Sequence, residues 1–376
     1  MRIAVNTRFL LPGKLEGIGW FTFETLKRIV EQHPEHEFYF LFDRPFSNEF
    51  VFADNVKPIV ISPPARHPFL WYWWFEWSIP AAIKKIKPDV FLSTDGYLSL
   101  KVKVPQILVM HDLAFEHFPD HVNKLTRIYY RYYSPKFANK AKRIATVSEY
   151  SKEDIHQHYQ IPIDKIDVVY NGSNELFVPL SENEKLEVKQ KYADGNNYFI
   201  YAGAIQPRKN VGNLFLAFEQ FKMETISTTK LIIAGRKAWH TEAAMHTLDT
   251  LKYKNDIIFT GHLERSELSK LMGGAIALAY VSLFEGFGIP LVEAMSCHVP
   301  IITSNVSSMP EVAGMAALQV NPKDVNEICK ALIRIETDQA LRALLISNGI
   351  EQRKKFGWQQ TADKLWQCMM TGLKTG

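Results

Sequence analysis

The feature that most limits the fold is an alternation of short β-branched runs with longer amphipathic stretches, repeated along almost the whole chain. Runs such as "RIAVNTRF" and "QILVMHD" are apolar and bounded by turn residues, as buried strands usually are. The stretches between them are long enough for helices, for example residues 18–32, about 71–87 and 124–141. Strands that alternate with helices predict a parallel sheet covered by helices on both faces.

A polar, charged interval divides this alternation into two halves. Residues 176–197, "LFVPLSENEKLEVKQKYADGNN", contain no buried strand and have room for one surface helix. The chain of 376 residues is long enough for two domains, and we expect an N-terminal one over 1–178 and a C-terminal one over 179–356. A last helix over 357–376 could pack back on the first domain. Ligands of doubly wound domains lie beyond the carboxyl ends of the strands, so two such domains facing each other would frame a cleft.

In the second half, the strands are predicted at "YFIYAGA", "KLIIAGR", "DIIFTG", "AIALAYVS", "VPIITS" and "AALQV", and the helices at about 211–225, 241–252, 266–273, 290–298, 324–335 and 338–355.

The composition limits the partners and the compartment. A net charge of +4 is too close to balance to indicate a nucleic-acid partner. The three cysteines lie far apart and form no metal-ligand spacing, which fits a reducing cytoplasm. The N-terminal "MRIAVNTRFLLPGKLEG" lacks the pattern of a signal peptide, and no window reaches the roughly 18 apolar residues of a spanning helix. We therefore expect a cytoplasmic protein, either soluble or peripheral at the inner face of the membrane.

Residues 282–295, "SLFEGFGIPLVEAM", place Glu285 and Glu293 on either side of a glycine-rich turn. The preceding run predicts a strand that ends near Ser282, and Pro290 suits the first turn of a helix "PLVEAMSC", with Glu293 in that first turn. Exposed glycine amides and a helix N-terminus favour an anion such as a phosphate. The two carboxylates could accept hydrogen bonds from hydroxyls, so the combination suits a sugar nucleotide. The alternative is a loop acid and an acid that complements the helix dipole.

Several motifs along the chain resemble those of one enzyme family. The string "EGFGIPLVEAMSCHVPIITSNVSSMPEV" resembles the donor-site signature of the family-four retaining glycosyltransferases of the GT-B fold. Further resemblances together span nearly the whole chain. In the first half, "GIGWFTFETL" resembles the glycine loop of the family and "VMHDLAFEHFPD" resembles its histidine loop. The strings "TVSEYSKEDI" and "VVYNG" resemble the domain junction, and "GAIQPRKNVGNLFLAF" resembles the basic diphosphate loop.

The resemblance implies a fold of two Rossmann-like domains and a reaction. A hexose of the mannose or glucose class would pass from a nucleotide diphosphate sugar to a hydroxyl of a glycan or lipid-linked acceptor, with retention of the anomeric configuration. The "GIG" start and "HDLAFEHFPD" favour mannosyltransferase-like members that use GDP-mannose, and a UDP-sugar stays open. The acceptor would belong to a cell-surface polysaccharide or a glycolipid.

The resemblance also assigns roles to individual residues. Arg208 and Lys209, after the strand "YFIYAGA", would stabilise the departing diphosphate, although a basic turn before a helix is the simpler reading. His111 would lie near the reacting centre, although a histidine at a strand end is often structural. Glu285 would bind a sugar hydroxyl and Glu293 the ribose.

Backbone contacts to the donor complete the predicted site. They are assigned to Gly286, Phe287, Gly288 and Ile289 in the acidic loop, to Gly261, His262 and Leu263 near the nucleobase, and to Gly17 and Gly19 in a turn that could equally be a simple helix entry.

No Asp-x-Asp occurs in the chain, so we expect neither a metal nor a further cofactor in the transfer. Arg208, Lys209 and helix dipoles would replace the charge of a metal. Two departures from the family pattern are peripheral. Val281 and Ser282 stand where the family often has proline and serine, and His298 stands where it usually has glycine.

An aromatic and basic segment is not explained by the donor site. Residues 68–80, "PFLWYWWFEWSIP", could form core, a sugar platform or a membrane-interface belt. Residues 124–143 contain seven basic residues and no acid. Such a surface could attract anionic lipid headgroups, or it could be an ordinary solvated helix face.

Two alternatives to a transferase remain. A nucleotide-sugar epimerase would use the same fold with different acid and base groups. A non-catalytic sugar-nucleotide binding protein would retain the donor site without turnover, and slow hydrolysis or transfer of the donor would separate it from an enzyme.

Overall fold

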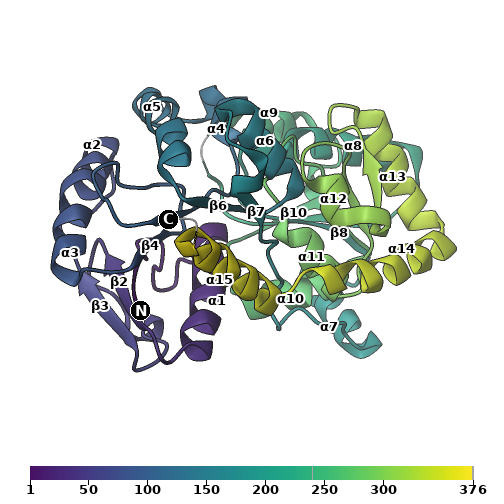
Figure 1. The fold of residues 1–376 in the computed structure, drawn as a ribbon. Coiled ribbons are helices and arrows are strands. Elements are labelled where there is room, and N and C mark those ends of the chain that lie inside the picture. The colour runs from purple at the N-terminus through teal and green to yellow at the C-terminus, as the bar shows by residue number, and fades with distance from the viewer. Residues whose placement is uncertain (239, 375–376) are drawn as a thin grey trace. The chain divides into compact units, whose positions relative to one another are not determined.

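The structure, a computed structural model, describes residues 1–238 and 240–374 and contains two compact units (Figure 1). The N-terminal unit comprises Met1–Asn171 and Trp358–Gly376, and the C-terminal unit comprises Gly172–Gly357. The sequence placed the boundary after residue 178, whereas the structure divides the chain at the end of the preceding "VVYNG". Each unit is a parallel sheet with helices, so the predicted fold class is confirmed.

The N-terminal unit is built on a seven-stranded parallel sheet with the order β3-β2-β1-β4-β5-β6-β7. The chain starts at β1, fills one side of the sheet and then crosses to β4 on the other side of β1. The strands are β1 (Arg2–Asn6), β2 (Glu37–Phe42), β3 (Val56–Val60), β4 (Val90–Ser93), β5 (Gln106–Val109), β6 (Arg143–Thr146) and β7 (Ile166–Val168). The helices are α1 (Gly17–Gln32), α2 (Pro68–Trp73), α3 (Ile79–Ile86), α4 (Ala114–His117), α5 (Lys124–Lys140), α6 (Glu149–Tyr159) and α15 (Trp358–Lys374).

The C-terminal unit repeats this plan with six parallel strands in the order β10-β9-β8-β11-β12-β13. Here β8 and β11 are the central neighbours at which the strand order reverses. The strands are β8 (Tyr198–Ala202), β9 (Lys230–Ala234), β10 (Ile257–Gly261), β11 (Ala277–Tyr280), β12 (Ile301–Ser304) and β13 (Ala317–Val320). The helices are α7 (Glu182–Ala193), α8 (Val211–Glu224), α9 (Glu242–Thr250), α10 (Arg265–Gly273), α11 (Ile289–Ser296), α12 (Met309–Ala313), α13 (Val325–Thr337) and α14 (Gln339–Gln352).

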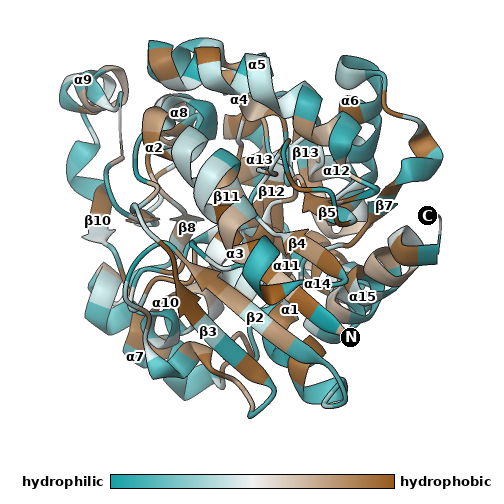
Figure 2. Cartoon of the chain, turned by 60° about the vertical axis from the view of Figure 1, so that its left-hand side comes forward, coloured by the Kyte–Doolittle hydropathy of each residue, from teal (hydrophilic) through white to brown (hydrophobic). Residues whose placement is uncertain are grey.

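The strands form the core, as expected for sheets covered on both faces. Every residue of β4 and β8 is buried, and Figure 2 shows the strands largely brown while the helices carry both colours. The surface helix expected within residues 176–197 is α7, which begins with a capping box: Ser181 Oγ accepts from the Glu184 amide, and the Glu184 carboxylate accepts from the Ser181 amide at 2.8 Å.

The C-terminal helix α15 belongs to the N-terminal unit (Figure 1). Trp366 stacks on His33, which follows α1, with ring centroids 3.7 Å apart. Thr361 Oγ1 donates to the carbonyl of Tyr170, and Gly372 lies so close to Ile107 of β5 that a Cβ would meet its side chain at 2.5 Å. The chain therefore closes its first unit with its last helix.

The aromatic segment is not one regular helix. The predicted helix over 71–87 begins earlier, at Pro68, and a π-helical turn over Trp74–Ser78 joins α2 to α3. Trp74 and Phe75 are fully buried core residues. Within the described residues, none of the helices combines the length and the apolar character needed to cross a bilayer.

Candidate functional site

The candidate site in the C-terminal unit lies at the carboxyl ends of two neighbouring strands. Arg208 and Lys209 belong to a short 3₁₀ turn, Pro207–Lys209, in the connection after β8. Glu285 lies in the loop after β11, the strand beside β8 in the sheet. Strand order thus brings together residues that are far apart in the sequence, at the point where such sheets usually bind ligands.

The three side chains form one charged cluster. Arg208 Nη1 donates to Glu285 Oε2 at 3.0 Å, and Lys209 Nζ donates to Glu285 Oε1 at 2.5 Å. The Tyr280 hydroxyl, at the end of β11, accepts from Lys209 Nζ at 2.7 Å and donates to Glu285 Oε1 at 3.0 Å. Two cations around one carboxylate leave a net positive charge, so the cluster can attract an anion.

Burial and neighbouring charges shift the pKa of Glu285 in opposite directions. Burial alone would raise the pKa of its carboxyl, but the charges of Arg208 and Lys209 outweigh it and lower the pKa to about 2. Glu285 is therefore ionised at any physiological pH. Burial, followed by the charge of Glu285, raises the pKa of Tyr280 well above its ordinary value, so its hydroxyl keeps its proton.

The loop that carries Glu285 is fastened to the loop after β12. The Glu285 amide donates to Ser307 Oγ at 3.1 Å, and Ser308 Oγ donates to the Glu285 carbonyl at 2.9 Å. Gly288 has a φ of +92°, and a Cβ there would meet the methyl group of Met309 at 2.7 Å. Both the backbone conformation and the packing therefore require glycine at this position.

Helix α11 begins one residue earlier than the sequence suggested. Gly288 precedes it, Ile289 is its first residue, and Pro290 follows in the first turn, where a missing N–H is harmless. The prediction that Glu293 lies in the first turn is wrong, because the earlier start moves it into the second turn.

Glu293 is buried but poorly partnered. The residue is 5% exposed, and the Arg265 guanidinium lies 3.9 Å from its carboxylate. Within residues 1–238 and 240–374, no side chain or amide lies at hydrogen-bonding distance and geometry from this carboxylate. Burial raises the pKa of Glu293, and Arg265 only partly opposes it. A buried carboxylate without donors is costly, so this position favours a ligand with hydroxyl groups.

The remaining backbone candidates of this unit lie in two loops. Gly261 ends β10 with a φ of +70°, and a Cβ added there would have no neighbour within 4 Å, so glycine is needed for conformation only. His262 and Leu263 follow in the loop before α10. The Phe287 side chain is buried against Phe356 in an edge-to-face contact, which leaves its backbone as the group able to meet a ligand.

His111, Gly17 and Gly19 belong to the N-terminal unit. His111 Nε2 is 2.9 Å from the carbonyl of Thr94, and the ring lies edge-on to Phe21. Burial lowers the pKa of His111, which favours the neutral ring. Gly17 and Gly19 are in the first turn of α1, and a Cβ on Gly19 would meet the Phe9 carbonyl at 2.9 Å, whereas Gly17 faces open space.

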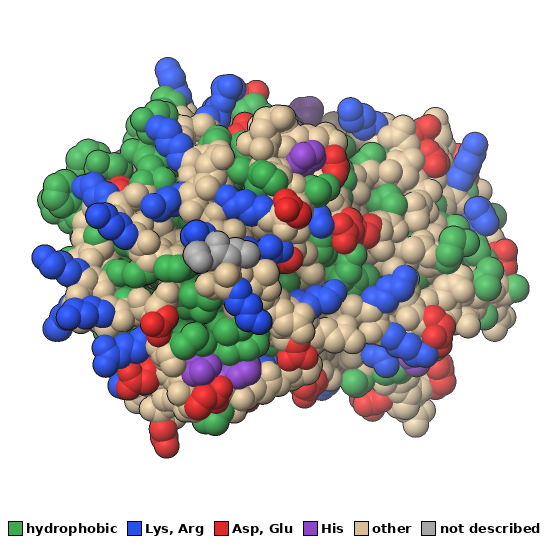
Figure 3. All heavy atoms as spheres, viewed as in Figure 1, with side chains coloured by type: hydrophobic (Ala, Val, Ile, Leu, Met, Phe, Trp, Pro, Cys, Tyr) green, Lys and Arg blue, Asp and Glu red, His purple; other side chains and the backbone are tan. Residues whose placement is uncertain are grey.

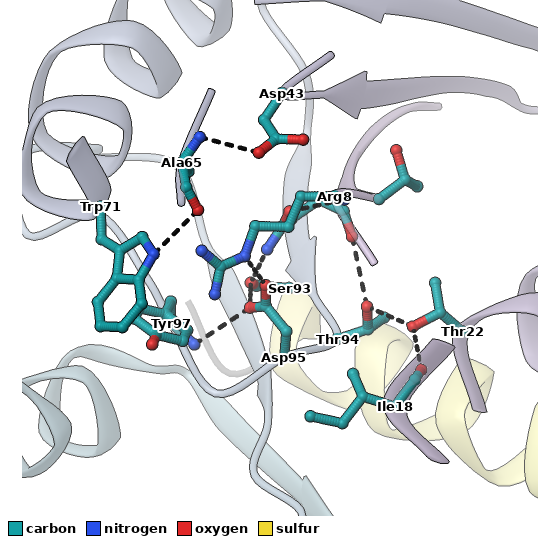
Figure 4. Close-up of polar contacts among 12 residues, drawn as sticks. Arg8, Ile18, Thr22, Asp43, Ala65, Trp71, Ser93, Thr94, Asp95 and Tyr97 are labelled. Atoms are coloured by element: carbon teal, nitrogen blue, oxygen red, sulfur yellow. Dashed lines mark hydrogen bonds and ion pairs between the residues drawn. The ribbon is translucent and has the colours of Figure 1, made fainter. Parts of the chain in front are cut away.

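Sequence reasoning missed a second ion pair, at the equivalent place in the N-terminal sheet (Figure 4). Arg8 follows β1, and its Nε donates to the carboxylate of Asp95, which follows β4. The guanidinium lies 4.2 Å from the centroid of the Tyr97 ring. Asp95 also accepts from Ser93 Oγ at 3.1 Å. The available signal was a charged residue two positions after each of two strands that prove to be neighbours.

Comparisons with known proteins assign the two halves of the chain. Residues 15–175 match the family described as Glycosyltransferase Family 4, and residues 182–352 match the family described as Glycosyl transferases group 1. Each match lies mainly in one structural unit.

Individual relatives and a solved structure agree with these family matches. The O-antigen chain mannosyltransferase B of Escherichia coli is 27% identical over 92% of this chain and 93% of its own length. The O-antigen chain mannosyltransferase RfbU of Salmonella typhimurium is 28% identical over 76% of this chain and 77% of its own. The solved structure of HepE from Anabaena, in complex with UDP and glucose, has the same fold, with a TM-score of 0.75 at 16% identity over 97% of this chain and 98% of HepE. The chain belongs to the glycosyltransferases of the GT-B fold, with a family 4 domain followed by a group 1 domain.

Proposed function

We propose that the protein transfers a hexose, with mannose favoured, from a nucleotide diphosphate sugar to a hydroxyl of a glycan or lipid-linked acceptor, with retention of configuration. Two relatives named as mannosyltransferases support the choice of sugar. The complex of HepE with UDP and glucose supports a nucleotide-sugar donor but keeps a UDP-sugar open beside GDP-mannose.

The observation that carries this proposal is the cluster of Arg208, Lys209 and Glu285. Breaking the glycosyl bond releases negative charge on the diphosphate, and two cations fixed beforehand by a shared carboxylate can take it up without reorganisation. The guanidinium offers a planar fork to phosphate oxygens, and the ammonium adds a point charge. The departing phosphate would itself accept the proton of the acceptor hydroxyl, so no separate strong base is required.

The two acids take different parts of the donor. The Glu285 carboxylate already accepts from Arg208, Lys209 and Tyr280. A carboxylate has roughly four acceptor sites, which leaves one for a sugar hydroxyl. Glu293 has its acceptor sites available for the hydroxyls of the ribose, whose donation would remove the cost of a buried carboxylate.

The other predicted contacts are proposals of the same kind. Backbone amides from Gly286 to Ile289 would meet the sugar or phosphate, and Gly261 to Leu263 would meet the base. His111, Gly17 and Gly19 rest on the resemblance of their loops to those of the family. We propose a metal-independent transfer, with the two cations beside Glu285 in the place of a metal.

The test is a thermal-shift panel of UDP, GDP, ADP and their sugars, followed by assays of donor hydrolysis and transfer. The true donor should raise the melting temperature by mass action. Glu285→Gln should lower turnover about 100-fold, whereas Glu293→Ala should mainly weaken donor binding. A protein that binds a donor but neither hydrolyses nor transfers it would be the non-catalytic alternative, and a protein stabilised by no nucleotide would refute the proposal.

We further propose that the N-terminal unit rests on an anionic bilayer that carries the acceptor. An exposed aromatic and aliphatic face lies on α2, the π-helical turn and α5, with Phe69 at 72%, Trp73 at 50% and Trp77 at 54% exposure. Leu125, Ile128 and Tyr132 of α5 are exposed as well, and we name these six residues the aromatic face. Tyr72 and Tyr133 join the two helices, with ring centroids 6.1 Å apart.

Cations border the aromatic face. Lys101 Nζ lies 3.6 Å from the ring centroid of Trp77, and Lys136 Nζ lies 3.2 Å from that of Tyr132. Figure 3 shows green and blue side chains gathered over α2 and α5. Residues 66–143 contain 13 Lys or Arg and six Asp or Glu. Exposed aromatic side chains with lysines over two of them fit a lipid headgroup layer, at the inner face of the membrane.

Co-sedimentation with phosphatidylglycerol vesicles tests this surface. Binding should be strong at low salt and weaker at high salt, and Trp73→Ala with Trp77→Ala should reduce it at least about tenfold. The matched control is Leu344→Ala, an exposed apolar residue of the C-terminal unit. Binding that is absent, insensitive to salt or unchanged in the double variant would refute the membrane proposal and leave the donor chemistry untouched.

A further inference from the structure

Three side chains outside the donor site converge in the N-terminal unit. His117 is the last residue of α4, in the loop region that follows His111. Asp154 and His158 lie one turn apart on α6, so both project from the same face of that helix. The trio therefore joins a short helix to a long one.

The distances between these groups are short. His117 Nε2 lies 2.9 Å from Asp154 Oδ1 and 3.0 Å from Oδ2. His158 Nδ1 lies 3.1 Å from Asp154 Oδ1 and also forms a hydrogen bond with the backbone carbonyl of Asp154 at 3.1 Å. One nitrogen from each histidine and one carboxylate oxygen all lie within 4.8 Å of one another. A single ion bonded at about 2.1 Å to each would need only small side-chain shifts.

The donor set has a clear chemical preference. Two imidazoles and one carboxylate are ligands of zinc and its neighbours in the first transition row, whereas magnesium and calcium prefer oxygen ligands. The Asp154 carboxylate is buried, while both histidines are partly exposed. Among the residues that the structure describes, the Asp154 carboxylate forms ion pairs with the two histidines and with no Lys or Arg. A divalent ion would place a permanent positive charge beside it.

We propose that His117, Asp154 and His158 bind a divalent transition-metal ion, with zinc as the best fit, and that this ion fastens α4 to α6. A second contact already joins the same elements, because the Tyr159 hydroxyl donates to Glu116 Oε1 at 3.0 Å. Three protein ligands leave a fourth position for water. The ion would fix the segment after His111 and take no part in stabilising the diphosphate.

Cobalt is the probe, because a nitrogen-ligated Co²⁺ ion absorbs visible light. The untagged, chelator-treated protein should bind one Co²⁺ per chain, zinc should displace it, and zinc should raise the melting temperature. His117→Gln and His158→Gln each retain a hydrogen-bonding group but remove a ligand, and each should weaken binding at least about tenfold. The same variants without metal should match the wild type in circular dichroism.

His156→Ala is the matched control on the same helix, because His156 Nδ1 lies 2.7 Å from the Ile161 carbonyl, outside the trio. It should bind cobalt as the wild type does. The proposal is overturned if the protein shows no saturable 1:1 binding, if binding survives in both glutamine variants, or if His156→Ala loses it equally. In those cases the trio is a hydrogen-bonded cluster only.

Discussion

The two sheets place an arginine and an acid at equivalent positions and surround them differently. In each unit the arginine follows the first central strand, and the acid follows the neighbouring strand across the point where the order reverses. Arg8 pairs with Asp95 in the N-terminal unit, and Arg208 pairs with Glu285 in the C-terminal unit. The same topology has thus produced two ion pairs at the edge where ligands usually bind.

The two arginine side chains, Arg8 and Arg208, differ in their exposure and in their neighbours. The Arg8 side chain is 4% exposed and lies against the rings of Phe75 and Tyr97, whereas Arg208 is 17% exposed and has Lys209 beside it. Burial alone would lower the pKa of Arg8, but the adjacent Asp95 raises it overall. We infer that the first pair stabilises its unit and that the second, with two cations on one carboxylate, serves to bind an anionic ligand.

The largest effect should come from Asp95→Asn, which leaves the Arg8 charge buried without its partner. We expect a loss of about 3–5 kcal/mol in the free energy of unfolding, measured by urea titration. Arg208→Gln should lower the free energy of unfolding clearly less, because Glu285 keeps its ion pair with Lys209. Equal losses of unfolding free energy in the two variants would contradict the difference that we infer between the two ion pairs.

The next effect concerns pH. The pKa of Glu285 is about 2 in the folded protein against an ordinary value of 4.5, so its stabilising contribution is complete above pH 4.5 and is lost as the pH falls towards 2. This shift corresponds to about 3 kcal/mol. The difference in unfolding free energy between the wild type and Glu285→Gln should therefore shrink by about 2 kcal/mol from pH 7 to pH 3. A difference that does not change with pH would contradict the ion-pair cluster.

Lys209→Ala should show whether the charge of Lys209 serves a ligand or the stability of the fold. We expect turnover to fall about 100-fold, because one of two cations facing the leaving group is lost. The free energy of unfolding should change less than in Asp95→Asn, because Arg208 still pairs with Glu285. Steady-state kinetics with the identified donor measure the first effect, and wild-type turnover would contradict the assignment.

The smallest effect lies at His298, where the family usually has glycine. His298 has a φ of +57°, shortly after the end of α11, a conformation that glycine adopts without strain. His298→Gly should stabilise the protein by up to about 1 kcal/mol, whereas His298→Ala, which retains a Cβ, should not. Thermal unfolding of the two variants side by side distinguishes them.

The periodicity of apolar residues predicted the strands and most helices, because the formation of each element depends mainly on residues that are close together in the sequence. The π-helical turn over Trp74–Ser78 escaped, since its aromatic residues also fit a regular helix. The start of α11 was misplaced because Pro290 marked the second helical residue and not the first. The cluster around Glu285 was anticipated only through resemblance to a family.

The pairing of distant loops could not be predicted from the residues alone. Arg8 and Asp95 meet because β1 and β4 are neighbours, and strand order is a property of the folded sheet. His117 and Asp154 meet because α4 packs beside α6, which no spacing in the sequence encodes. Sequence patterns thus predicted the elements, and the topology determined the sites.

The fastening of the Glu285 loop to Ser307, Ser308 and Met309 has a thermodynamic consequence. Fixing one residue of a flexible backbone costs about 1–2 kcal/mol of entropy. Because these hydrogen bonds already hold the segment in the folded protein, little of that entropy cost would fall on donor binding. Donor affinity can then reflect the quality of the polar contacts themselves, as in other preorganised receptors.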